Sequence, residues 1–138
     1  MPSDVEERIA IESDSDVVVA RQRARELAAD LELTSTDQTL LATAISEVAR
    51  NITTYAKRGE VLLSIVRDEG GREGIRVVAR DDGPGIEDIE RALQDGYTSG
   101  GGLGLGLPGA RRLVDEFSIE SVPTVGTTVT LVKWSRAR

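Results

Sequence analysis

Five glycines within the seven residues 100–106 constrain this chain more than any other feature of its sequence. Glycine loses more conformational freedom on ordering than any other residue, so a soluble domain seldom keeps such a run without a reason. Successive backbone N–H groups at the start of a helix form a site for an anion such as phosphate. We interpret the segment as a mobile lid over phosphate. The alternative is a flexible linker, but linkers favour Gly and Ser, whereas Leu alternates with Gly here.

The composition excludes several kinds of chemistry. The 138 residues include neither Cys nor His. Disulfides, thiolate and imidazole nucleophiles are therefore absent, and the ligands that zinc prefers are missing. The usual general base near neutral pH is missing as well. A metal site in this chain would need oxygen ligands, which favours Mg²⁺ or Ca²⁺.

The charge balance narrows the class of partner. Seventeen Lys and Arg face 24 Asp and Glu, which gives a net charge of -7, and aromatic residues make up only 3%. Nucleic-acid binding normally needs a basic surface and often stacking aromatics, so we expect neither nucleic acid nor base stacking. No apolar run is long enough for a membrane span, and the acidic N-terminus is not a signal peptide. We expect a soluble, cytoplasmic protein whose residues 1–138 form one domain.

Hydrophobic periodicity and turn residues predict the order β-α-α-β-β-α-α-β-β. The second helix is expected to open at a capping box formed by Ser35 and Gln38. The predicted strands are residues 8–11, 61–66, 74–80, 117–122 and 127–134, and the predicted helices are residues 14–31, 35–55, 86–93 and 107–116, with Asp14 or Ser15 as the first N-cap. Hairpins with few crossovers favour an α+β fold: a two-layer sandwich with a mixed, mostly antiparallel sheet and helices on one face.

A carboxylate and an amide, Glu47 and Asn51, lie one helical turn apart on the second helix. A helical projection puts them on one shoulder of the apolar stripe Leu41, Ile45, Val48 and Ile52, opposite a solvent-facing side with Ser46, Arg50 and Thr54. Polar groups at such an edge need partners, because an unpaired one costs about 1–3 kcal/mol. On spacing alone, the two residues cap a neighbouring loop or bond each other. In the functional alternative, Asn51 offers oxygen to a hard cation and Glu47 handles a proton.

The segment DDGPGI, residues 81–86, directly follows a predicted strand. Asp81 at the strand end could accept a hydrogen bond from an exocyclic amine, and glycines lacking Cβ let a ligand approach the backbone. Taken alone, the segment is better explained as an ordinary Asx/Gly turn with a solvated Asp. The pattern GLGLPG at residues 104–109 also matches GxGxxG, but it follows no strand and has no acid about 20 residues on, so we reject a dinucleotide site. The Walker A pattern and the HRD and DFG triplets are absent too.

Taken together and in this order, Glu47-x-x-x-Asn51, DDGPGI, GGLGLGL and Gly126-Thr127 resemble the sequence boxes of the Bergerat-fold ATPases. That superfamily includes type-II topoisomerases, heat-shock chaperones and sensor histidine kinases. The segments ISEVARNITTYAKRGE, DGYTSGGGLGLGLPGARRLVDEFSIES and GTTVTLVKW resemble the RsbT family of small bacterial serine kinases. The similarity runs from about residue 15 to residue 134.

The resemblance implies a role for each matching position. Asn51 would be the Mg²⁺ ligand, and Glu47 would be the general base for a substrate hydroxyl. Asp81 would bind the adenine amine, and the remaining positions would build the nucleotide pocket. Among these, Gly83 and Gly85 would shape its floor, Thr127 would support the adenine from the sheet, and Gly102, Leu103, Gly104, Leu105 and Gly106 would form a Gly-rich ATP lid. Phosphoryl transfer needs positioning, a metal and a group for the attacking hydroxyl, and none of these requires His or Cys.

The resemblance further implies an ATP- and Mg²⁺-dependent serine/threonine kinase that acts as a partner-switching regulator. Its substrates would be antagonist proteins with a STAS domain in a large stress-sensing assembly, the stressosome. Once released by phosphorylation, the kinase would bind and activate a PPM-type phosphatase. The first alternative is an anti-sigma factor kinase that binds and inhibits a sigma factor. The second is a non-catalytic nucleotide-sensing scaffold, which the intact pair of Glu47 and Asn51 disfavours. The oligomeric state stays open.

Overall fold

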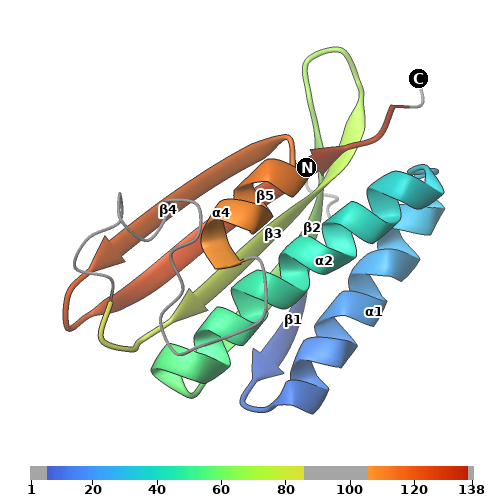
Figure 1. The fold of residues 1–138 in the computed structure, drawn as a ribbon. Helices are drawn as coiled ribbons and strands as arrows, with labels where there is room; N and C mark the ends of the chain where they lie inside the picture. Colours follow the sequence, from blue (N-terminus) through green and yellow to red (C-terminus); the bar gives the residue numbers. More distant parts are fainter. Residues whose placement is uncertain (1–5, 86–105, 137–138) are drawn as a thin grey trace.

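Five strands form one sheet in the computed structural model, which describes residues 6–85 and 106–136 (Figure 1). Their spatial order is β1-β2-β3-β5-β4, and each neighbouring pair is antiparallel. The strands are β1 (Glu6–Ile11), β2 (Gly59–Arg67), β3 (Glu73–Asp81), β4 (Glu116–Val122) and β5 (Gly126–Trp134). All five predicted strands are therefore confirmed, and each observed strand contains its predicted range.

In the part of the chain that the structure describes, three helices cover one face of this sheet: α1 (Asp14–Asp30), α2 (Ser35–Asn51) and α4 (Gly106–Leu113) (Figure 1). The helices and the sheet make two layers, which confirms the predicted α+β fold class. Among the described strands the sheet is wholly antiparallel rather than mixed. The predicted helix at residues 86–93 and most of the predicted lid lie outside the described residues.

The core fills the space between the two layers. Side chains of a strand alternate between the two faces of a sheet, so every second residue of β2 and β3 points towards the helices. Val61, Leu63, Ile75 and Val77 are all fully buried there. The predicted stripe of α2 meets them, since Leu41, Ile45, Val48 and Ile52 are each no more than 2% exposed. The opposite face of the sheet carries no helix of the described residues (Figure 1).

The helices α1 and α2 begin at the predicted residues 14 and 35, but the residues that cap them differ from the prediction. Thr34, not Ser35, caps α2, because Thr34 has the extended conformation of an N-cap and its Oγ1 accepts the N–H of Asp37 at 3.0 Å. The Gln38 side chain donates to the Leu33 carbonyl instead of completing a capping box. Likewise, the N-cap of α1 is Ser13 rather than Asp14 or Ser15.

The end of the long second helix is also different. Regular α-helix stops at Asn51, and a π-helical turn, η1 (Ile52–Ala56), replaces the expected continuation to residue 55. Lys57 then takes a φ of 74°, which turns the chain into β2. The prediction that Ser46 faces solvent is wrong: it is 5% exposed, and its hydroxyl donates to the Ala42 carbonyl. The reason is that α2 packs against α1 and α4 as well as the sheet.

The helix α4 ends three residues before the predicted residue 116. The chain leaves the helix early because the N–H of Asp115 already donates to the Val132 carbonyl of β5, at 2.9 Å. The buried ammonium group of Lys133 on β5 also contacts two of the helices. Lys133 is 4% exposed, donates to the Leu113 carbonyl and lies 3.5 Å from the carboxylate of Asp37, which Arg136 also contacts.

Candidate functional site

Glu47 lies on α2 with a side chain that is only 10% exposed. Its Oε1 accepts the N–H of Gly106, the first residue of α4, at 2.9 Å. Its Oε2 lies 3.2 Å from the guanidinium of Arg50, one turn further along α2. A carboxylate at a helix N-terminus also interacts favourably with the helix dipole. Glu47 therefore caps the start of α4, at the end of the Gly-rich segment. Spacing alone had indicated a capping role of this kind.

Asn51 is the last residue of α2 and is partly buried. Within the described residues, its side chain makes no capping hydrogen bond to the turn that follows. The π-helical turn follows it directly, and π-helical turns inside or at the end of α-helices occur frequently at functional sites. The turn packs against β3, so the end of α2 lies beside the end of that strand.

Asp81 is the last residue of β3 and pairs directly with Thr127 of β5. Both residues follow the alternation of the buried residues Ala79 and Val129, so their side chains point to the helix side of the sheet. The carboxylate of Asp81 accepts the N–H of Gly83 at 2.8 Å. Burial raises the pKa of Asp81 above its usual value, against the lowering effect of the backbone N–H groups of Gly83 and Thr127.

Thr127 itself is 6% exposed, and its hydroxyl lies 2.9 Å from that of Ser121 on β4. The two hydroxyl groups form a hydrogen bond across the pair of strands. This contact fixes the side chain of Thr127 beside the end of β3. Thr127 is therefore held where it was expected, on the sheet next to Asp81.

Glycines form the turn after β3 because the protein packs tightly against its own backbone there. A Cβ on Gly83 would lie 2.5 Å from the Cβ of Ala56 in η1. Gly85 has a φ of 77°, and a Cβ there would lie 2.5 Å from the Val122 carbonyl oxygen. The sequence pattern indicated the turn correctly, but it gave no signal that Ala56 and Val122 press against it.

The predicted residues thus fall into three described groups at one end of the sheet, on the helix side. Glu47 and Asn51 come from α2, Gly106 begins α4, and the last group, Asp81, Gly83, Gly85 and Thr127, surrounds the ends of β3 and β5. The structure joins the first two groups through the Glu47–Gly106 hydrogen bond, and the first and last through η1. Gly102, Leu103, Gly104 and Leu105 lie outside the described residues.

Residues 36–137 match the family of histidine kinase-, DNA gyrase B-, and HSP90-like ATPases. The chain belongs to this family. Membership of this ATPase family implies that the chain uses ATP. The chain is 45% identical over 128 residues to serine/threonine-protein kinase RsbT of Bacillus subtilis, covering 93% of this chain and 96% of that protein. This identity over nearly the whole of both chains supports protein-serine/threonine kinase activity.

More distant relatives of the same family carry a different name. The chain is 30% identical over 118 residues to the anti-sigma F factor of Caldanaerobacter subterraneus, covering 83% of this chain and 82% of that protein. Among solved structures, the RsbU and RsbW domains of a Mycobacterium tuberculosis protein match 99% of this chain and 34% of theirs, with 22% identity and a TM-score of 0.65. The mycobacterial sensor histidine kinase MprB matches 97% of this chain and 100% of its own, with 18% identity and a TM-score of 0.56. These two likenesses show the shared fold. None of the described helices has the length and apolar character needed to cross a membrane.

Proposed function

We propose that this chain is a Mg²⁺- and ATP-dependent serine/threonine kinase of a partner-switching pathway, and that its substrates are STAS-domain antagonist proteins. The observation that carries the proposal is the placement of Glu47 and Asn51 one turn apart on α2, beside the strand end that bears Asp81. The 45% identity to a named serine/threonine kinase supports the choice of substrate hydroxyl.

Asn51 would supply a protein oxygen to Mg²⁺. Mg²⁺ keeps several waters and binds substrate phosphates, so it needs only one or two protein ligands. No group of three or more acidic residues that could hold a metal occurs among the described residues. A single amide oxygen combined with the phosphates of ATP therefore suits this site. When bound, Mg²⁺ would neutralise charge on the phosphates.

Asp81 would recognise the nucleotide base. Its carboxylate lies at the strand end, already accepts one backbone N–H and has further acceptor sites for the exocyclic amine of adenine. Thr127 lies directly across from it on β5, and the turn with Gly83 and Gly85 closes the same end. In this proposal the backbone N–H groups of the Gly-rich segment before Gly106 would cover the phosphates, while the N–H of Gly106 itself stays with Glu47.

Glu47 would act as the general base. The substrate hydroxyl oxygen attacks the γ-phosphorus of ATP, the bond to the bridging oxygen of ADP breaks, and the hydroxyl proton passes to Glu47. A carboxylate has about four lone-pair sites, so Glu47 can keep its hydrogen bond to Gly106 and still accept this proton. Arg50 holds the second oxygen on the same side of α2.

In this proposal phosphorylation of the STAS protein frees the kinase to bind and activate a PPM-type phosphatase. A second function deserves its own test because several relatives are named anti-sigma F factor, at 29–33% identity. In that case the chain would bind and inhibit a sigma factor, and phosphorylation of its antagonist would be secondary.

The proposal is tested by incubating the full chain with Mg²⁺, labelled ATP and purified STAS proteins, followed by mapping of the phosphorylated residue. We expect label on one Ser or Thr of a STAS protein. Asn51→Ala should abolish the transfer, whereas Gln22→Ala, which removes an exposed amide from α1, should not. A chain that binds a sigma factor and phosphorylates no STAS protein would favour the second function. Full activity of Asn51→Ala would contradict the metal assignment.

A further inference from the structure

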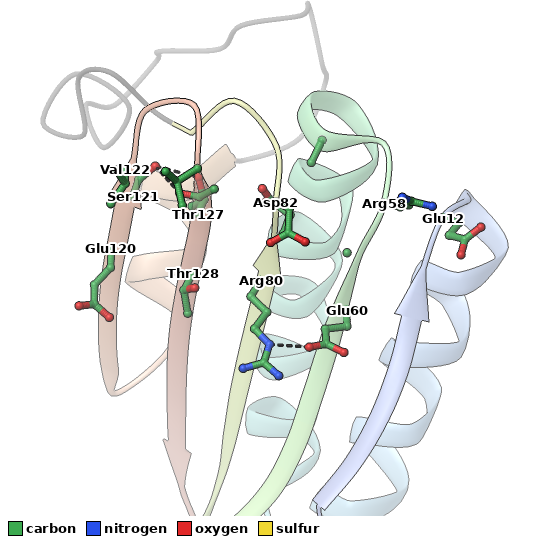
Figure 2. A pocket seen from close by; sticks show the side chains of 15 residues that line it. Glu12, Arg58, Glu60, Arg80, Asp82, Glu120, Ser121, Val122, Thr127 and Thr128 are labelled. Carbon is green, nitrogen blue, oxygen red and sulfur yellow. Dashed lines mark hydrogen bonds and ion pairs between the residues drawn. The ribbon is translucent and has the colours of Figure 1, made fainter.

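A cavity of about 790 Å³ opens over one end of the sheet, on the face that carries no described helix (Figure 2). Its floor includes Glu60, Arg80, Thr128 and Glu120, which stand opposite one another on β2, β3, β5 and β4. Their sequence neighbours Val61, Ala79 and Val129 are buried on the helix side. Strand alternation therefore directs the four floor side chains away from the helices.

The cavity borders the proposed nucleotide site, because Asp81 and Thr127 are among the residues that line it. Strand alternation directs the side chains of these two residues to the helix side, away from the four floor side chains. Gly126 packs against the same wall, since a Cβ there would lie 2.1 Å from the Asp81 carbonyl oxygen. Of the described residues of the proposed kinase machinery, Glu47 and Asn51 on α2 do not line the cavity.

Carboxylates outnumber cations around the cavity. Glu12, Glu60, Asp82 and Glu120 line it, against Arg58 and Arg80. Glu60 is already neutralised, because Arg80 contacts its carboxylate (Figure 2), and Arg8 contacts it as well. Among the ion pairs of the described residues, none includes Glu12, Asp82 or Glu120. Only Arg58, which lies beside Glu12 (Figure 2), stands against these three carboxylates, so the concave surface has a net negative charge and favours a cationic ligand over phosphate and nucleic acid.

Apolar side chains stand beside this acidic surface. Val122 and Val125, at the turn between β4 and β5, are 56% and 61% exposed, the highest values among the large apolar residues of residues 6–85 and 106–136. Both line the cavity. A small cation would leave these valines in water, whereas a polypeptide with cationic and apolar side chains would cover them. Burial of apolar surface of this kind is favourable by about 25 cal/mol per Å².

We propose that this cavity is a docking site for a short basic segment of a partner protein. Lys or Arg side chains of the segment lie among Glu12, Asp82 and Glu120, and an apolar side chain next to them packs against Val122 and Val125. Charge complementarity selects the segment, and the exposed valines fix its position. The proposal does not depend on the kinase assignment, because it uses the opposite face of the sheet.

The test is a titration of the full ¹⁵N-labelled chain with the peptide Lys-Val-Lys-Leu-Lys-Val and with its counterpart carrying Glu at each Lys position. We expect saturable shifts of the amide signals of Glu120, Thr128 and Val125 with the Lys peptide only. The double variant Glu12→Lys/Glu120→Lys should weaken binding about tenfold or more, since two attractions become repulsions. Val125→Ser should weaken binding about threefold.

The matched control is Asp30→Lys/Glu69→Lys, which changes the net charge equally at two exposed positions outside the cavity. It should bind the Lys peptide as tightly as the unchanged chain. Equal weakening in both double variants would overturn the proposal, because binding would then follow overall charge. Shifts that map elsewhere, or no saturable binding, would overturn it as well. Thermal melts of all variants confirm that they remain folded.

Discussion

Replacement of Gly126 by Ala should weaken both the fold and the proposed nucleotide site. Gly126 opens β5 with a φ of 150°, and a Cβ there would meet the Asp81 carbonyl oxygen at 2.1 Å. That oxygen belongs to the backbone and cannot rotate aside, so the ends of β3 and β5 would have to separate. Overpacking of this kind costs about 1–3 kcal/mol. The unfavourable φ adds about 1 kcal/mol.

We therefore expect Gly126→Ala to lower the free energy of unfolding by about 2–4 kcal/mol. For a chain of this size, that loss corresponds to a melting temperature lower by roughly 5–15 °C. Urea denaturation and calorimetry would measure both quantities. Because Asp81 is displaced, titration calorimetry should also show weaker ATP binding.

Gly71→Ala is the matched control for this change. Gly71 has a φ of 83°, but a Cβ there would have no atom within 4 Å. It thus reports the backbone strain without the collision, at a cost of about 1 kcal/mol. If Gly126→Ala lost no more stability than Gly71→Ala, the close approach to Asp81 would not be the reason for the glycine, and the reasoning would be refuted.

Three further changes test individual side chains. Glu47→Gln should slow phosphoryl transfer about 10²–10⁴-fold in single-turnover assays with ATP affinity unchanged, because Gln can still accept the Gly106 N–H but cannot take a proton; normal turnover would leave Glu47 a purely structural role. Asp81→Asn should abolish ATP binding in calorimetry without lowering the melting temperature at pH 7. Burial raises the pKa of Asp81, so its contribution to stability is largest when it is protonated and is lost as the pH rises through the raised value. Any gain in melting temperature of the Asn variant should therefore shrink as the pH falls towards about pH 4. A lower melting temperature of this variant at pH 7 would contradict the sign of this effect. Lys133→Met should cost roughly 1–3 kcal/mol in urea denaturation, less than a fully orphaned buried charge, because Asp37 keeps its contact with Arg136; an unchanged midpoint would show that the buried ammonium adds nothing.

The sequence predicted the strands well because their alternation and turn residues are local signals. All five strands contain the predicted ranges, and the stripe of α2 is buried as expected. The fold class followed from the element order. The N-cap of α2 was off by one residue because Thr34 and Ser35 are both good caps, and only the backbone conformation decides between them.

Long-range packing was out of reach of the sequence pattern. Ser46 is buried because α2 has neighbours on more than one side, which a helical projection does not reveal. The contact between Glu47 and Gly106 joins residues 59 positions apart, and the cavity collects residues from four strands and the segments that flank them. The sequence singled out Glu47, Asn51, Asp81 and Thr127 through the family resemblance, and the roles given to them stay predictions.

Asp81 and Thr127 pair directly in the sheet, so a single layer of backbone forms the partition between the two faces of the sheet there. The nucleotide would lie on one side of this partition, and a docked basic segment on the other. Any coupling between the two sites through this wall would be reciprocal. If ATP changes the affinity for the segment by a given factor, the segment changes the affinity for ATP by the same factor. The strand ends at Asp81 and Thr127 are the route by which such a coupling would pass.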